Sequence, residues 1–96
     1  MSKVEWLPES LDDLKRHFDF LAPKNPVAAH KAAQKIRQAG FSLENFPYRG
    51  TLLQDESNCR KLLVDSGRYG YKIIYRVEED KVVILRIHHG REARSS

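Results

Sequence analysis

Two histidines, a glycine and an arginine follow an apolar run near the C-terminus, where residues 86–92 read RIHHGRE. Such a group could be a metal site, an acid/base pair, a phosphate contact or a solvated strand end. Neighbouring strand residues point to opposite faces, so one metal ion could not readily take both His88 and His89. No Cys, Asp or Glu stands at a supporting spacing, and Glu92 lies beyond the expected strand end, so we expect no metal site.

The segments before this stretch predict the strands that must position it. Three strand signals follow one another, CRKLLVD, RYGYKIIYRV and KVVILRIHH, with the turn sequences DSG and EED between them. A three-residue loop over residues 79–81 predicts one apolar face, with Val77 opposite Val83, Tyr75 opposite Leu85, and Ile73 opposite Ile87. The other face then pairs Arg76 with Ile84, Ile74 with Arg86, and Lys72 with His88. A two-residue loop would change this register.

This register predicts a basic sheet face. Its members are Lys72, Arg76, Arg86 and His88, with Arg60 joining if the preceding strand aligns suitably. Like charges at this spacing repel one another unless an anion, a phosphate backbone or an acidic partner neutralises them. Alternatively, Arg76 and Arg86 reach Glu78, Glu79 or Asp65 from a solvated face.

The N-terminal half predicts a short strand and two helices. KVEWLP alternates as a strand and stops at proline. A first helix starts at Ser10, with a capping-box-like Asp13 and an apolar stripe of Leu11, Leu14, Phe18 and Leu21. Asp12, Asp13, Lys15, Arg16 and Asp19 lie away from this stripe, and His17 and His30 are expected in solvent. Asn25 and Pro26 start a second helix over residues 26–46 that runs through Gly40 and ends before Pro47. Its stripe is Ala28, Ala32, Ile36, Ala39, Leu43 and Phe46.

Composition indicates one folded domain over residues 1–96, with 41% hydrophobic residues, 4 prolines and 5 glycines. The single cysteine, Cys59, excludes an internal disulfide and indicates a reducing compartment. No apolar run is long enough for a membrane span, and the first residues do not resemble a signal peptide. We therefore expect a soluble, cytoplasmic protein. Its net charge of +4 is concentrated in residues 49–96, which suits nucleic acid, an acidic protein or plain solubility.

The predicted class is α+β: an N-terminal strand, then an antiparallel helical hairpin packed on a mainly antiparallel sheet, in the order β-α-α-β-β-β. RKLLVDSGRYGYKIIYRVEEDKVVILRIHHGRE resembles the C-terminal half of the RelE/ParE superfamily of toxins from type II toxin–antitoxin modules. In that superfamily an Arg-led strand, a strand like YKIIYRV, an acidic turn and a strand ending in HGR recur in this order. FPYRG after the second helix agrees with it. The resemblance covers residues 3–91 and implies a RelE/ParE-like fold.

The resemblance implies a toxin that arrests growth until a cognate antitoxin neutralises it. ParE-like members inhibit DNA gyrase, whereas RelE-like members cut messenger RNA on the ribosome, usually with a C-terminal Tyr or His. No tyrosine follows Ile87, and HHGRE is nearer the ParE-like ending. We therefore expect a gyrase inhibitor. A nuclease using His88, Arg86, Lys72 and Arg60 is the alternative, and an inactive relative that binds only its antitoxin is the third possibility.

The same comparison suggests the contact residues. We expect Arg60, Lys72, Arg76, Arg86, His88 and Arg91 to touch the target. Phe41, which is either directed outward or tucked in by a break at Gly40, is expected to meet the antitoxin with Ala28 and Ala32. His89 is expected to pack at the strand end. No cofactor is expected, and the toxin should form a hetero-oligomer with its antitoxin.

Overall fold

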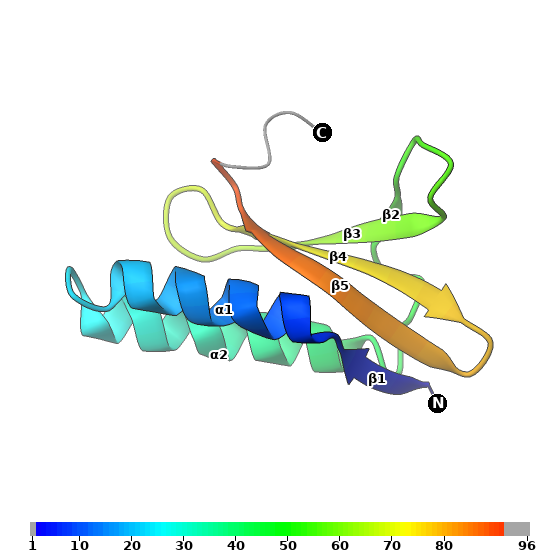
Figure 1. Ribbon diagram of the computed structural model, residues 1–96, viewed down its shortest axis with the longest axis horizontal. Helices are drawn as coiled ribbons and strands as arrows, with labels where there is room; N and C mark the ends of the chain where they lie inside the picture. The colour runs from blue at the N-terminus through cyan, green and yellow to red at the C-terminus, as the bar shows by residue number, and fades with distance from the viewer. Residues whose placement is uncertain (1, 92–96) are drawn as a thin grey trace.

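The computed structural model describes residues 2–91 and shows two helices side by side on one face of a five-stranded sheet (Figure 1). The elements in chain order are β1 (Lys3–Trp6), α1 (Pro8–Leu21), α2 (Pro26–Ser42), β2 (Thr51–Leu52), β3 (Cys59–Val64), β4 (Tyr71–Glu78) and β5 (Lys81–His89). The strand order is β1-β5-β4-β3-β2, with β1 parallel to β5 and the other pairs antiparallel. The predicted α+β class and the order of elements are confirmed, with the short β2 as an addition.

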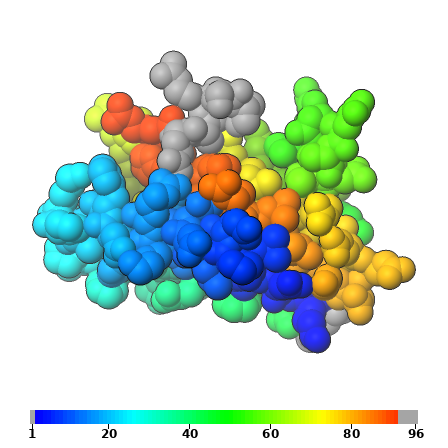
Figure 2. Space-filling view, viewed as in Figure 1, coloured from blue at the N-terminus to red at the C-terminus, as the bar shows by residue number. Residues whose placement is uncertain are grey.

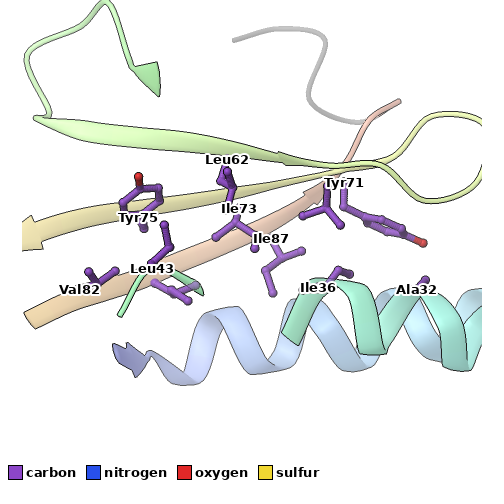
Figure 3. Packing of buried hydrophobic residues seen from close by; sticks show 11 residues of the cluster. Ala32, Ile36, Leu43, Leu62, Tyr71, Ile73, Tyr75, Val82 and Ile87 are labelled. Atoms are coloured by element: carbon purple, nitrogen blue, oxygen red, sulfur yellow. The ribbon is translucent and has the colours of Figure 1, made fainter. Parts of the chain in front are cut away.

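The core lies between the helices and the sheet. Ile73 on β4 and Ile87 on β5 are fully buried above Ile36 of α2, with Tyr75 toward one end of the sheet and Tyr71 toward the other (Figure 3). Successive residues of β4 alternate between buried and half-buried because side chains of a strand point to opposite faces. The face of the sheet that carries Lys72 and Ile74 is therefore the face away from the helices, which we call the open face.

The β4–β5 hairpin keeps the predicted register over one half only. Ile73 pairs with Ile87 as predicted, but the loop has two residues instead of three, and Tyr75 pairs with Ile84 rather than Leu85. A bulge between Ile74 and Tyr75 takes up the difference. The bulge lets Val82, Ile84 and Ile87 all be fully buried, although strict alternation could not place all three on one face.

The second helix runs through Gly40, as predicted. Asn25 caps its start by accepting a hydrogen bond from the Ala28 amide at 3.0 Å. A Cβ atom at position 40 would lie 2.4 Å from Cζ2 of Trp6, so the glycine makes room for the indole of β1. The helix ends at Ser42, four residues earlier than predicted, and Phe46 is consequently 64% exposed instead of lying in the apolar stripe.

The first helix differs more from the prediction. It begins at Pro8 rather than Ser10, and its N-cap Leu7 provides no side-chain cap. The Ser10 hydroxyl is buried and donates to the Leu7 carbonyl, so the predicted capping box is wrong. Leu11 is 49% exposed, whereas Ser10, Asp13 and His17 face inward. Within residues 2–91, no helix is both long enough and apolar enough to cross a bilayer.

Candidate functional site

Polar side chains of α1 cover the edge of β5 that β1 leaves bare. β1 pairs with β5 only as far as Ile84, while β5 continues to His89. Beyond that point Asp13 Oδ2 accepts from the Ile87 amide at 2.9 Å, and His17 Nε2 lies 2.8 Å from the Ile87 carbonyl oxygen. Figure 2 shows the side chains of α1 (blue) lying directly against β5 (orange). The two residues satisfy backbone groups that would otherwise be buried without partners.

Asp13 also holds Arg86 of the predicted basic face. Its carboxylate accepts from Arg86 Nε at 2.7 Å and from Arg86 Nη2 at 3.1 Å, with Arg16 Nη2 at 3.4 Å. Burial by itself raises the pKa of Asp13, but the hydrogen bonds from Arg86 and Ile87 and the guanidinium charge outweigh burial and lower the pKa. Arg86 is thus fixed by a carboxylate that was predicted to belong to a capping box, away from the apolar stripe.

The open face gathers part of the predicted basic set. Lys72 lies directly opposite His88, and Ile74 opposite Arg86, as the sequence predicted. Arg76 donates to Glu78 Oε2 from Nε and Nη2 at 3.0 and 2.9 Å, which is one of the ion pairs considered for a solvated face. Arg76 and Arg86 therefore carry carboxylate partners, whereas Lys72 has none among residues 2–91.

Arg60 does not join this face. It pairs with Tyr75, so it points to the side that the helices occupy, and Nη1 donates to the Gly50 carbonyl at 2.8 Å. The alignment of β3 that would bring Arg60 to the basic face does not occur, and the neighbouring Lys61 lies on the open face opposite Ile74 instead. A shift of one residue moves every side chain of a strand to the other face.

The histidine pair is divided between the two faces. His88 lies on the open face, while His89 packs among aromatic rings on the helix side, with ring centroids 5.2 Å from Tyr71, 5.7 Å from Tyr69 and 6.4 Å from His17. His17 is thus buried, contrary to prediction. No group of three potential metal-ligating side chains comes together in the described part of the chain.

Gly90 and Arg91 complete the strand end. A Cβ atom at position 90 would lie 2.1 Å from the Tyr69 carbonyl oxygen, so only glycine fits there, and the Gly90 amide donates to the Gly70 carbonyl. The Arg91 guanidinium lies 5.1 Å from the centre of the Tyr69 ring, which is 48% exposed. This close packing gives His89, Gly90 and Arg91 structural roles at the strand end. Tyr69 had no predicted role, because only the fold brings it to His89 and Arg91.

The three residues expected to meet the antitoxin lie in different environments. Phe41 is 54% exposed, with its ring 5.6 Å from that of Trp6, so it is directed outward along a continuous helix. Ala28 is half-buried. Ala32 is 5% exposed and belongs to the core, so Phe41 and Ala28 are the accessible members of the set.

Comparison with known proteins identifies the family. A family model described as "ParE toxin of type II toxin-antitoxin system, parDE" matches residues 4–94. The chain belongs to the ParE toxin family. Over 94 residues it is 35% identical to Toxin RelE3 of Caulobacter vibrioides, covering 98% of this chain and 100% of the relative. Over 89 residues it is 34% identical to Toxin RelE2 of the same organism, covering 93% and 96%.

Two solved structures share the fold. A chain of the chromosomal ParDE TA system from P. aeruginosa superimposes with a TM-score of 0.75 at 24% identity, covering 93% of this chain and 96% of the other. The toxin–antitoxin complex RelBE2 from Mycobacterium tuberculosis gives a TM-score of 0.65 at 24% identity, covering 92% and 96%. The ParE-family chain is thus a type II toxin of the RelE/ParE superfamily, as its sequence predicted.

Proposed function

We propose that this toxin arrests growth by binding and inhibiting DNA gyrase, and that a cognate antitoxin neutralises it. The observation that carries this proposal is the separation of the four side chains that a nuclease would need. Arg60 points to the helix side, and Asp13 holds Arg86 at the edge of β5. Of the set, Lys72 and His88 remain opposite each other on the open face.

Messenger cleavage places stronger demands on geometry than binding does. A general base must take the proton of the ribose 2′-OH, and cationic groups must stabilise the charge that develops at the phosphate. An arginine that is already bound to a buried carboxylate is a poorer phosphate ligand than one without such a partner. A protein–protein contact, by contrast, uses side chains spread over a wide surface.

One alternative has a specific observation in its favour. Lys72 is a cation directly opposite His88, which is a candidate acid/base group. In addition, the two curated relatives carry RelE names. A ribosome-dependent endoribonuclease is therefore the second candidate. The third possibility, an inactive relative that binds only its antitoxin, predicts no effect on either target.

Adding the purified toxin separately to a gyrase supercoiling reaction and to a translation reaction tests the proposal. We expect inhibition of supercoiling and intact messenger. His88→Ala should weaken that inhibition only slightly, whereas Arg91→Ala at the strand end should weaken it more. In a nuclease, His88→Ala should instead lower messenger cleavage by about 10²–10⁴-fold, because the proton-transfer group is lost. Ribosome-dependent cleavage with supercoiling unaffected overturns the proposal.

The remaining expectations about partners belong to the same proposal. The antitoxin should form a hetero-oligomer with the toxin in the cytoplasm, where gyrase, ribosomes and reduced cysteines are found. Two fold relatives come from toxin–antitoxin systems, which supports such a partner. We expect the toxin to act without a cofactor.

A further inference from the structure

Three large apolar side chains are exposed together where α2 leads to the sheet. Phe46 is 64% exposed, Tyr48 is 65% exposed and Leu52 is 49% exposed. Phe46 and Tyr48 line a hollow with Ser42, Asn45, Pro47 and Arg49. Arg60 links this hollow to β2, because it pairs with Leu52 and its guanidinium lies 5.0 Å from the centre of the Tyr48 ring. We call Phe46, Tyr48, Arg49, Leu52 and Arg60 the loop surface.

The backbone beneath the loop surface is fixed by the core. The Tyr75 side chain is fully buried, yet its hydroxyl reaches the loop, where it donates to the Pro47 carbonyl and accepts from the Gly50 amide, both at 2.8 Å. A Cβ atom at position 50 would lie 2.7 Å from that hydroxyl. Arg60 adds a hydrogen bond to the Gly50 carbonyl. The exposed rings therefore stand on a preorganised loop, which lowers the entropy lost when a partner binds.

The loop surface carries positive charge without compensating carboxylates. Arg49 Nη1 donates to the Ser42 hydroxyl at 2.6 Å, and Arg60 donates to backbone carbonyls. Neither arginine forms an ion pair within residues 2–91. Aromatic rings beside arginines are typical of binding surfaces, and a patch of this kind favours a partner with apolar side chains flanked by Asp or Glu.

We propose that the loop surface is the docking site for a segment of the cognate antitoxin that carries both acidic and apolar side chains. This inference rests on the proposed function of the chain as a gyrase inhibitor that an antitoxin neutralises. Charge complementarity argues for this occupant over a second copy of the toxin. A two-fold symmetric contact would bring Arg49 and Arg60 of both copies into the same interface, and like charges brought together weaken such an interface. The loop surface also lies away from the open face, so antitoxin contact here need not occupy Lys72 or His88.

The test measures binding of the co-encoded antitoxin by calorimetry. We expect the double variant Phe46→Ala and Tyr48→Ala to raise the Kd by about 10²-fold or more, because central aromatic side chains carry most of the affinity of an interface. Arg49→Glu alone should also weaken binding. Phe20→Ala is the matched apolar control, since Phe20 is 69% exposed at the α1–α2 end of the molecule, opposite the connection from α2 to β2 (Figure 1). Lys31→Glu is the matched charge control on α2.

A supercoiling assay separates this inference from the proposed function. The double variant should still inhibit gyrase, but added antitoxin should no longer relieve the inhibition. If the double variant and Arg49→Glu both bind the antitoxin as tightly as the controls do, the inference is wrong. Loss of gyrase inhibition with normal antitoxin binding would assign the loop surface to the target and also overturn it. Where the unmodified toxin leaves supercoiling unaffected, the proposed function fails, and calorimetry still decides the docking site.

Discussion

At the residue scale, Asp13 joins the first helix to the last strand through one carboxylate. It accepts from Arg86 and the Ile87 amide, and it is 4% exposed. Asp13→Ala leaves a buried amide without an acceptor and a guanidinium without its partner. We expect the free energy of unfolding in urea to fall by about 2–3 kcal/mol, less than for a fully buried pair because the Arg86 side chain is 48% exposed.

Asp12→Ala provides the matched control for that substitution. Asp12 is exposed on the same helix turn, and surface substitutions of this kind usually change stability by no more than about 0.5 kcal/mol. Equal urea midpoints for the Asp13 and Asp12 variants would show that the contacts to β5 contribute nothing to stability.

Asp13 and His17 also show what hydropathy could not reveal. Asp13 and His17 indicate a polar helix face by their types, and the sequence predicted Asp13 away from the apolar stripe and His17 in solvent. They are buried because β5 extends beyond β1 and its backbone needs polar partners. That requirement depends on the lengths of two strands whose paired residues, such as Lys3 and Lys81, are far apart in the chain. Hydrophobic periodicity is read within windows of about 11–18 residues, so it carries no information on such a pairing.

At the scale of elements, α2 and β1 fit together at a glycine. Alanine at position 40 would favour the helix by about 1 kcal/mol, but its Cβ would lie 2.4 and 2.5 Å from the Trp6 ring and 3.1 Å from Ile84 Cδ1. Overpacking of this kind costs about 1–3 kcal/mol. We therefore expect Gly40→Ala to destabilise the protein in urea. In a Trp6→Leu background the same substitution should become neutral or stabilising, and a persistent loss there would point to the backbone instead.

The helices and strands were largely predictable because their periodicity is local, whereas their exact fit was not. The apolar and β-branched residues of 71–78 and the apolar run within 81–89 identify β4 and β5, and Lys72 was correctly placed opposite His88. The bulge at Tyr75 and the face of Arg60 depend on which register buries most apolar surface across several strands. The residues of the candidate site could not be predicted fully for the same reason, because a shift of one residue in the register of β3 replaces Arg60 by Lys61 on the open face.

At the scale of the whole molecule, the toxin presents cations on two separate surfaces. Lys61 and Lys72 lie on the open face, and Arg49 and Arg60 lie on the loop surface on the other side of β3. The side chains behind the net charge of +4 therefore do not form one continuous basic patch. This arrangement allows two acidic partners to be distinguished by the shape of the surface as well as by charge, because the arginines of the loop surface stand beside exposed aromatic rings.

The stability of the whole chain should depend on pH through three buried groups. The pKa of Asp13 is lowered, whereas burial raises the pKa of Tyr71 and, against the Gly50 hydrogen bond and nearby arginines, that of Tyr75. As pH falls below about 4, the unfolded chain takes up a proton at Asp13 before the folded chain does, so stability decreases. As pH rises above about 10, the unfolded tyrosines lose protons while the buried ones retain theirs, and stability decreases again.

Urea unfolding measured across this pH range checks the expected loss of stability at both acidic and alkaline pH. Asp13→Asn should be less stable than the unmodified toxin at neutral pH and should lose less stability on acidification, because the group with the lowered pKa is gone. Tyr71→Phe should make the alkaline decline shallower without changing the acidic one. If the free energy of unfolding falls equally at low pH with and without the Asp13 carboxylate, other carboxylates govern this fall. The contacts of Asp13 with Arg86 and Ile87 would then not be the main source of acid sensitivity.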